Sequence, residues 1–177
     1  MSSIVIAEQA AHMRAAFDRS FAEAPHRDTT VRHDFLAVGI GADVYAIRLS
    51  EVAGLFADKK ITPIPGRDLT LMGIAGFGGA ILPVHDLRAI LGYATSATPR
   101  WLVVTAKSAL ALAFDAFEGH FRVPLDAIAL SAGGDISRPH VTGLVHAHDR
   151  ARAIVDIPAL LSMIATQAAP RTTRKER

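Results

Sequence analysis

Two histidines near the carboxyl end, His146 and His148, have the spacing in this sequence that best fits metal chemistry. Residues two apart on a strand leave the same face, so with Asp149, His140 or His85 they could bind a divalent cation. No set of glutamates and histidines with firm ligand spacing accompanies them. We therefore expect polar side chains on a solvent-facing hairpin and no metal, and we keep a small metal-dependent enzyme as an alternative.

Three aspartates could be mistaken for catalytic carboxylates. Asp86 and Asp156 each precede a short apolar run at the same place in a repeated motif, which predicts structural helix caps. Asp115 lies within an apolar strand, which favours a hydrogen-bonded structural carboxylate over a general base. The sequence has no P-loop and no nucleophile elbow, and its glycine cluster at 76–79 opens no long helix of the dinucleotide-binding kind. We expect no catalytic residues and no cofactor.

Composition sets the outer limits. The chain has 177 residues, of which 50% are hydrophobic and 20% are charged, enough for one ordinary domain or two small lobes. It has no cysteine, which excludes disulfides and thiol chemistry. No apolar run approaches a membrane span, and the first residues lack the basic region of a secretory signal. These features favour a cytoplasmic protein without direct membrane insertion.

Basic residues concentrate at the carboxyl end, where four arginines and lysines face one glutamate after residue 170. Since the formal net charge is only +2, the rest of the chain is close to neutral. A neutral body with a basic tip does not predict a nucleic-acid surface. We expect residues 168–177 to form a solvated, disordered tail.

The stretch that organises the chain is residues 71–91, LMGIAGFGGAILPVHDLRAIL. Glycines between two short apolar runs indicate a tight turn between strands. Asp86 is placed to cap a following helical turn that buries Leu87, Ile90 and Leu91. The stretch therefore predicts strand, glycine turn, strand and short helix.

The end of this unit recurs in the second half. VHDLRAIL at 84–91 aligns without gaps on IVDIPALL at 154–161, and at the same offset Gly73-Ile74 falls on Gly143-Leu144. Upstream, FLAV at 35–38 matches WLVV at 101–104. The pattern indicates a duplicated β unit and a pseudo-symmetric pair of small lobes.

Other segments follow from periodicity. Residues 4–24 carry an apolar stripe at helical spacing, which predicts an amphipathic helix over 1–26 that covers the body or docks on a partner. Residues 58–67 hold Pro63 and Pro65 and predict an edge or crossover segment. Residues 50–56 fit a helical turn or a strand. Further strands are expected at 34–40, 44–49, 101–105, 109–113, 115–124, 141–148 and 152–156, and a last helix at 158–164.

The order of these motifs resembles the CheW family of chemotaxis coupling proteins. The resemblance covers residues 34–164 and rests on 45–47, 61–65, 73–74, 79–87, 114–117 and 154–157. It implies a mainly β fold of two pseudo-symmetric, five-stranded SH3-like barrels around an apolar seam. Lobe 1 would span 34–92 and lobe 2 101–164, with the amino-terminal helix and short helical caps added.

The resemblance also implies a function. The protein would be a non-enzymatic signalling adaptor that couples methyl-accepting chemoreceptors to a CheA-type histidine kinase in a chemosensory array. Its partners would be the kinase regulatory domain and the cytoplasmic helical tip of the receptor. A divergent scaffold of a non-flagellar pathway, with a different partner set, is the alternative.

The chain departs from the family at the surface that the resemblance implicates in coupling. The family turn reads N-L-R-G, where this chain has Gly76-Phe77-Gly78-Gly79, and a common family glutamate is replaced by Gly54. We expect Phe77 to present an exposed ring as an anchor in place of the missing arginine. The predicted partner-binding positions are Val52, Gly54, Gly73, Phe77, Gly78 and Gly79.

Overall fold

The computed structural model describes residues 31–66, 68–94, 99–130 and 140–168. The helix expected over 1–26 and the tail beyond residue 168 lie outside these ranges. The strands are β1 (Arg32–Ile40), β2 (Asp43–Arg48), β3 (Val52–Ala57), β4 (Leu71–Phe77), β5 (Ala80–Asp86), β6 (Trp101–Thr105), β7 (Ala111–Phe114), β8 (Ala116–Pro124), β9 (Ile128–Leu130), β10 (Val141–Ala147) and β11 (Arg150–Val155). The helices are η1 (Leu49–Glu51), α2 (Leu87–Ile90), η2 (Leu125–Ala127) and α3 (Ile157–Ala168).

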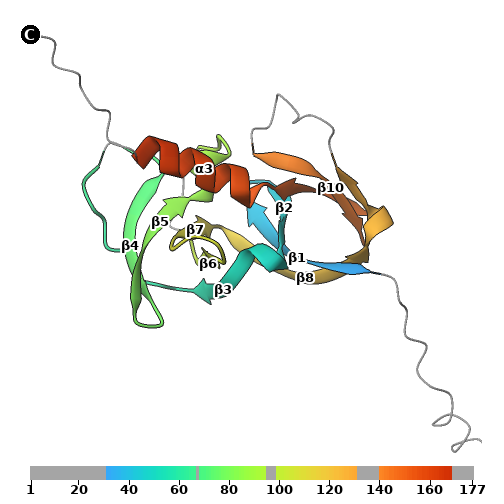
Figure 1. Ribbon diagram of the computed structural model, residues 1–177, viewed down its shortest axis with the longest axis horizontal. Helices are drawn as coiled ribbons and strands as arrows, with labels where there is room; N and C mark the ends of the chain where they lie inside the picture. Colours follow the sequence, from blue (N-terminus) through green and yellow to red (C-terminus); the bar gives the residue numbers. More distant parts are fainter. Residues whose placement is uncertain (1–30, 67, 95–98, 131–139, 169–177) are drawn as a thin grey trace, which may run out of the picture. The chain divides into compact units, whose positions relative to one another are not determined.

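The described strands form two sheets (Figure 1). A six-stranded sheet has the order β8-β1-β2-β11-β10-β9, and a five-stranded sheet has the order β3-β6-β7-β5-β4. The mainly β class and the two-part architecture expected from the sequence are confirmed. The six-stranded sheet has one strand more than expected, because the chain after η2 adds β9 beside β10.

The two sheets exchange strands between the halves of the sequence. β1 and β2 join β8–β11, whereas β3, β4 and β5 join β6 and β7. The boundaries 34–92 and 101–164 therefore do not delimit the two sheets. The exchange is made by parallel pairs: β11 lies beside β2, with Ile154 opposite Ala46, and β5 lies beside β7, with Val84 opposite Ala111.

Despite the exchange, the sheets share one plan. Read from one edge, β8-β1-β2-β11-β10 corresponds to β3-β6-β7-β5-β4, and each order has its parallel pair at the same place. β9 also has a counterpart: Thr62 forms an isolated bridge with Ile74 on β4, as Ala129 pairs with Leu144 on β10. The duplication seen in the sequence is thus a duplication of sheet architecture.

Two glycines make room for these flanking segments. An added Cβ on Gly73 would lie 2.1 Å from the carbonyl oxygen of Thr62, and one on Gly143 would lie 2.3 Å from that of Ala129. Gly73 also has a φ of +146°, which side chains rarely tolerate. The strands can approach this closely only because both positions lack a side chain.

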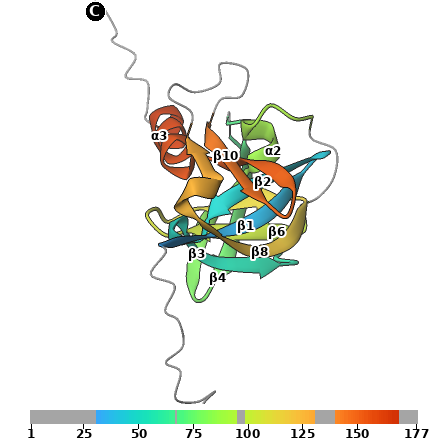
Figure 2. The ribbon, with the colours of Figure 1, turned by 90° about the vertical axis from the view of Figure 1, so that its right-hand side faces the viewer.

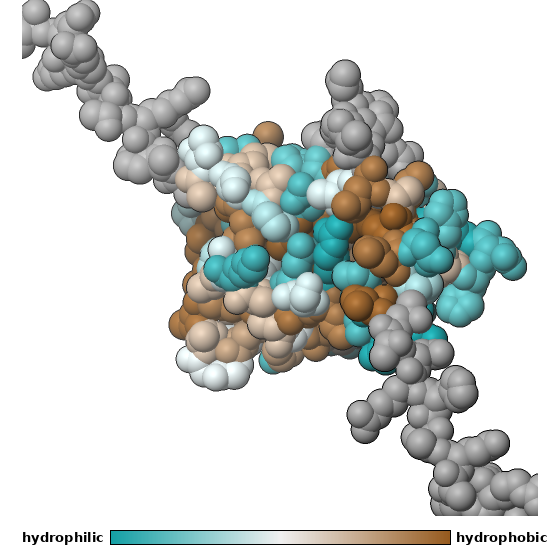
Figure 3. All heavy atoms as spheres, turned by 45° about the vertical axis from the view of Figure 1, so that its right-hand side comes forward, coloured by the Kyte–Doolittle hydropathy of each residue, from teal (hydrophilic) through white to brown (hydrophobic). Residues whose placement is uncertain are grey.

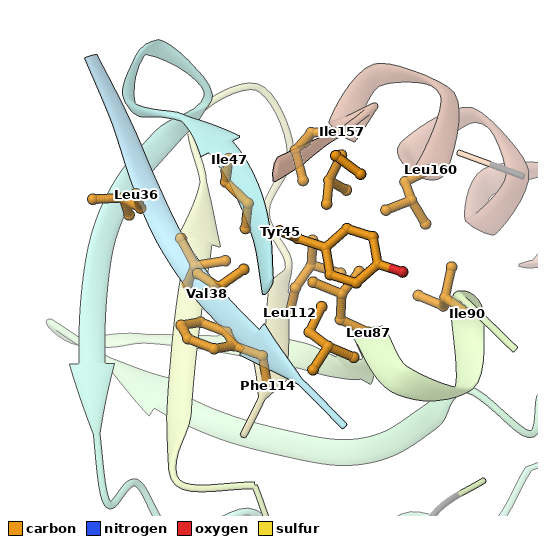
Figure 4. Packing of buried hydrophobic residues seen from close by; sticks show 14 of the residues in the cluster. Leu36, Val38, Tyr45, Ile47, Leu87, Ile90, Leu112, Phe114, Ile157 and Leu160 are labelled. Atoms are coloured by element: carbon orange, nitrogen blue, oxygen red, sulfur yellow. The ribbon is translucent and has the colours of Figure 1, made fainter. Parts of the chain in front are cut away.

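The core has three parts. One apolar cluster lies within each sheet, around Phe35 and Phe121 in the six-stranded sheet and around Phe77 and Leu102 in the five-stranded sheet. The largest cluster fills the seam between the sheets, where β1 and β2 meet β6, β7, α2 and α3 (Figure 4). Contacts between Phe56 on β3 and Phe77 on β4, at opposite edges of the five-stranded sheet, indicate that this sheet curls on itself.

Helix α3 covers the seam. Ile157, Leu160 and Ile164 recur at helical spacing, and all three are buried in the seam cluster. Each such side chain contributes about 1.5–3 kcal/mol by leaving water. In both ribbon views α3 lies at the top and the β4–β5 hairpin at the bottom (Figures 1 and 2).

Asp156 immediately precedes α3, and its Oδ1 accepts a hydrogen bond from the backbone N–H of Ala159 at 2.9 Å. Asp86 has the same role at α2, where Oδ1 accepts from the N–H of Arg88 at 2.8 Å. We expect Asp156→Ala to lower the free energy of unfolding by about 0.5–2 kcal/mol, because the helix loses its cap. Urea denaturation measures this, and an unchanged stability would contradict the capping role.

Candidate functional interface

The β4–β5 hairpin carries Gly73, Phe77, Gly78 and Gly79, four of the six expected binding positions. Phe56 on β3 packs against Phe77, with ring centroids 5.0 Å apart. An added Cβ on Gly54 would lie 2.8 Å from the ring of Phe56. The missing side chain at Gly54 therefore leaves the space that the Phe56 ring occupies.

Phe77 is buried, with 6% of its surface exposed, so the expectation of an exposed anchor is wrong. Along β4 the alternate residues Gly73, Ala75 and Phe77 all face the interior. The ammonium of Lys59 lies 5.2 Å from the centroid of Phe56 and 5.9 Å from that of Phe77. These cation–π contacts place a positive charge over the pair of rings.

The exposed large apolar side chain of the hairpin is that of Ile81, with 72% of its surface accessible. It lies on β5 directly opposite Gly76, which is exposed and has no side chain to cover it. Gly78 and Gly79 form the turn with φ of +56° and +92°, and both are exposed. The hairpin thus presents an isoleucine beside bare backbone, and we call Gly76, Gly78, Gly79 and Ile81 the hairpin tip.

Val52 and Gly73 do not belong to the hairpin tip. Val52 lies at the other end of β3 opposite Thr105 and packs partly buried against the seam cluster. Gly73 is buried beneath Thr62. The packing around these two residues is internal, so of the six expected positions only Gly78 and Gly79 present surface at the tip.

A partly buried ion pair joins three segments, and no sequence pattern indicates its arginine. Nη1 of Arg88 donates to both carboxylate oxygens of Asp115 at 2.9 Å, and Nη2 donates to the carbonyl of Ala94. The N–H of Gly41 donates to the same carboxylate at 2.7 Å. Asp115 stands at the bend between β7 and β8, so this pair fixes the point where the chain leaves one sheet for the other.

Tyr93 extends this network. Its hydroxyl donates to Asp43, so the hydroxyl of Tyr45, 2.7 Å away, is the donor in the second bond. Burial, together with the Asp43 carboxylate and the Tyr45 hydroxyl, raises the pKa of Tyr93 above its ordinary value. The network ties the segment after α2 to the β1–β2 turn.

The expectation that His146 and His148 alternate along one strand is wrong. β10 ends at Ala147, and His148 lies in the turn with a φ of +49°. Asp149 follows with a φ of +58°, so this turn has the conformation that Gly78 and Gly79 adopt in the first hairpin. Among the described residues, no three histidine, aspartate or glutamate side chains gather as a metal site would need.

A second exposed apolar surface lies on the six-stranded sheet. Figure 3 shows brown side chains gathered on the face that carries β9 and β10. Leu125, Leu130 and Leu144 are exposed by 60%, 65% and 44%.

In the part of the chain that the structure covers, no helix is long and apolar enough to cross a membrane.

Comparisons with known proteins agree with this architecture. The family model of the CheW-like domain matches residues 34–165. Protein FrzA of Myxococcus xanthus is 30% identical over 99 residues, which cover 53% of this chain and 62% of that relative, less than two thirds of its length.

Among solved structures, the scaffolding protein TtCheW from Thermoanaerobacter tengcongensis superimposes with a TM-score of 0.64 and 18% identity. The match covers 71% of this chain and 89% of that chain, and at this identity it supports the fold. Because the family model spans most of the chain and the fold agrees, the chain belongs to the CheW-like family.

Proposed function

We propose that this protein couples methyl-accepting chemoreceptors to a CheA-type histidine kinase. It would do so in the cytoplasm by binding the regulatory domain of the kinase and the helical tip of the receptor. Family membership supports this role, because CheW-like scaffolds generally interact with kinases and receptors of these classes. The observation that carries the proposal is the hairpin tip, which exposes an apolar side chain at the family's coupling turn.

The chemistry of the hairpin tip sets the kind of contact. Ile81 offers an apolar side chain, and Gly76, Gly78 and Gly79 let a partner approach the backbone closely. Apart from the residues next to each glycine in the chain, no heavy atom lies within 4 Å of where a Cβ would stand on these three glycines. The partner surface should therefore be apolar and flat, with polar groups that can reach main-chain N–H and C=O groups.

The alternative, a scaffold with a different partner set, is favoured by one observation. Gly54 and Gly78 stand where the family tends to have a glutamate and an arginine, and the ring of Phe56 fills the space at Gly54. A partner that relies on bidentate contacts to a guanidinium would lose them here. We propose that this chain is selective for partners with an apolar patch at that position.

Ile81→Asp tests the hairpin tip. We expect the dissociation constant for the kinase regulatory domain or the receptor tip to rise at least tenfold, about 1.4 kcal/mol, because a charge replaces the apolar contact. Isothermal titration calorimetry measures both. Phe77→Ala does not serve here, because its ring is buried and its loss would act through folding.

Leu69→Asp is the matched control. Leu69 is 95% exposed and lies just before β4, at the end of that strand away from the turn. It should leave both dissociation constants unchanged. Equal binding by wild type and Ile81→Asp would contradict the hairpin tip as the contact surface.

A further inference from the structure

Arg152 is a buried arginine on β11 with only 8% of its surface exposed. It pairs with Val145, which is fully buried, so both side chains enter the interior of the six-stranded sheet. Its guanidinium lies 5.0 Å from the centroid of the Phe121 ring, which in turn stacks on Phe35. A permanent positive charge therefore sits against the aromatic core of this sheet.

The charge of Arg152 has no carboxylate partner among the described residues. Nη1 donates to the carbonyl oxygen of Ala147 at 3.0 Å. Nε is buried and has no acceptor within hydrogen-bond distance. Buried charges in proteins are normally paired, and one carbonyl dipole with one ring face does not compensate a guanidinium.

The internal repeat shows that the fold does not require a charge here. At the offset of 70 residues that aligns Asp86 with Asp156, Arg152 corresponds to Leu82. Leu82 is buried in the apolar cluster of the five-stranded sheet. An aliphatic side chain thus occupies the corresponding position in the other sheet. Packing of the fold therefore does not explain why an arginine stands at position 152.

The head group of Arg152 lies at the turn end of its hairpin, because Nη1 bonds to Ala147, the last residue of β10. His146, His148 and Arg150 at this end are exposed, and Asp149 is the acidic residue of the turn. With the histidines neutral, Arg150 and Arg152 outnumber Asp149 at the end of the β10–β11 hairpin, so its net charge is positive. We call residues 146–152 the second hairpin end.

We propose that the second hairpin end is a binding site for an acidic side chain of a protein partner, with Arg152 as the residue that receives the carboxylate. Nη1 of Arg152 is already engaged and its Nε is buried, so the guanidinium has few donors left for an occupant. A single carboxylate fits this arrangement, because a doubly charged phosphate would need more cationic donors. The site belongs to the six-stranded sheet and does not rest on the proposed kinase and receptor contacts at the other sheet. An aspartate or glutamate of the partner supplies the negative counter-charge that Arg152 lacks in the free chain.

The test uses the full chain and a short capped oligoglutamate peptide as the probe, with an oligoglutamine peptide and inorganic phosphate as comparisons. NMR follows the Nε–Hε signal of Arg152. We expect a saturable shift with oligoglutamate and none with oligoglutamine. No shift with oligoglutamate, or the same saturable shift with phosphate at equal concentration, would overturn the proposal.

Two variants locate the effect. Arg152→Leu should weaken oligoglutamate binding at least tenfold and should melt no lower than wild type, because it installs the residue found at Leu82. Arg150→Leu removes an exposed arginine two positions away and should change binding less than threefold. Equal losses of oligoglutamate binding in both variants would mean general attraction to a basic surface. A lower melting temperature for Arg152→Leu would mean that the arginine is structural. Either result contradicts the proposed site.

Discussion

Gly73→Ala should destabilise the protein by about 3–4 kcal/mol, among the largest effects of any single substitution in this chain. The new Cβ would overlap the carbonyl of Thr62, and it would also have to accept a φ of +146°. The atoms in its way are backbone atoms of Thr62 and Pro63, which cannot rotate aside. The segment that holds Thr62 would have to move away from β4, and the two hydrogen bonds between Thr62 and Ile74 would be lost.

Gly143→Ala should have an effect of similar size, because the same clash arises with the carbonyl of Ala129. Gly76→Ala is the matched control on β4, since an added Cβ there meets nothing within 4 Å. We expect it to change stability by less than about 1 kcal/mol. Urea denaturation of the three variants decides the matter: similar midpoints for Gly73→Ala and Gly76→Ala would contradict the close approach.

Arg88→Leu is expected to cost about 2–4 kcal/mol, because it leaves the carboxylate of Asp115 without its cation and the carbonyl of Ala94 without a donor. The cost falls short of that of a fully buried pair because the side chain of Asp115 is 22% exposed. Denaturation with a double-mutant cycle of Arg88→Leu and Asp115→Ala measures the coupling.

The double variant should lose less stability than the sum of the single variants, since neither charge is then left alone. Arg100→Leu is the comparison, because it breaks an ion pair with Asp58 in which both side chains are 65% exposed. That loss should stay within about 1 kcal/mol. An equal effect of Arg88→Leu and Arg100→Leu would show that the buried pair does not hold the bend at Asp115.

Local elements were predictable from the sequence. Residues 71–91 form the expected strand, glycine turn, strand and short helix, because Gly78 and Gly79 permit the turn and Asp86 provides the cap. The repeat offset located Gly73 and Gly143, two positions that later proved sterically constrained. These features depend on neighbours in the chain, which sequence patterns record directly.

Strand partners were not predictable in the same way. The apolar pattern of β2 would be the same whether the strand paired with β11 or with another strand of its own half. The sequence pattern therefore does not reveal the exchange of strands between the halves. η2 and β9 are three residues each, too short to show a period.

Side-chain direction at the candidate interface explains why the expected exposure of Phe77 is wrong. Phe77 is expected outside as an anchor in place of the missing arginine, but Ala75 and Phe77 alternate with Gly76 and therefore face inward together. That alternation was present in the sequence and would have indicated Ile81 as the exposed residue. Arg88 and Arg152 had no such signal, because an isolated arginine in a sequence is usually on the surface.

The most direct test of the proposed role is sedimentation velocity on a mixture of this protein, a CheA-type kinase and a receptor cytoplasmic fragment from the same organism. If the protein couples the two, all three should sediment as one complex, and the kinase and receptor fragment should separate when the protein is omitted or replaced by Ile81→Asp. A kinase and receptor fragment that sediment apart in the presence of saturating wild-type protein would contradict the account.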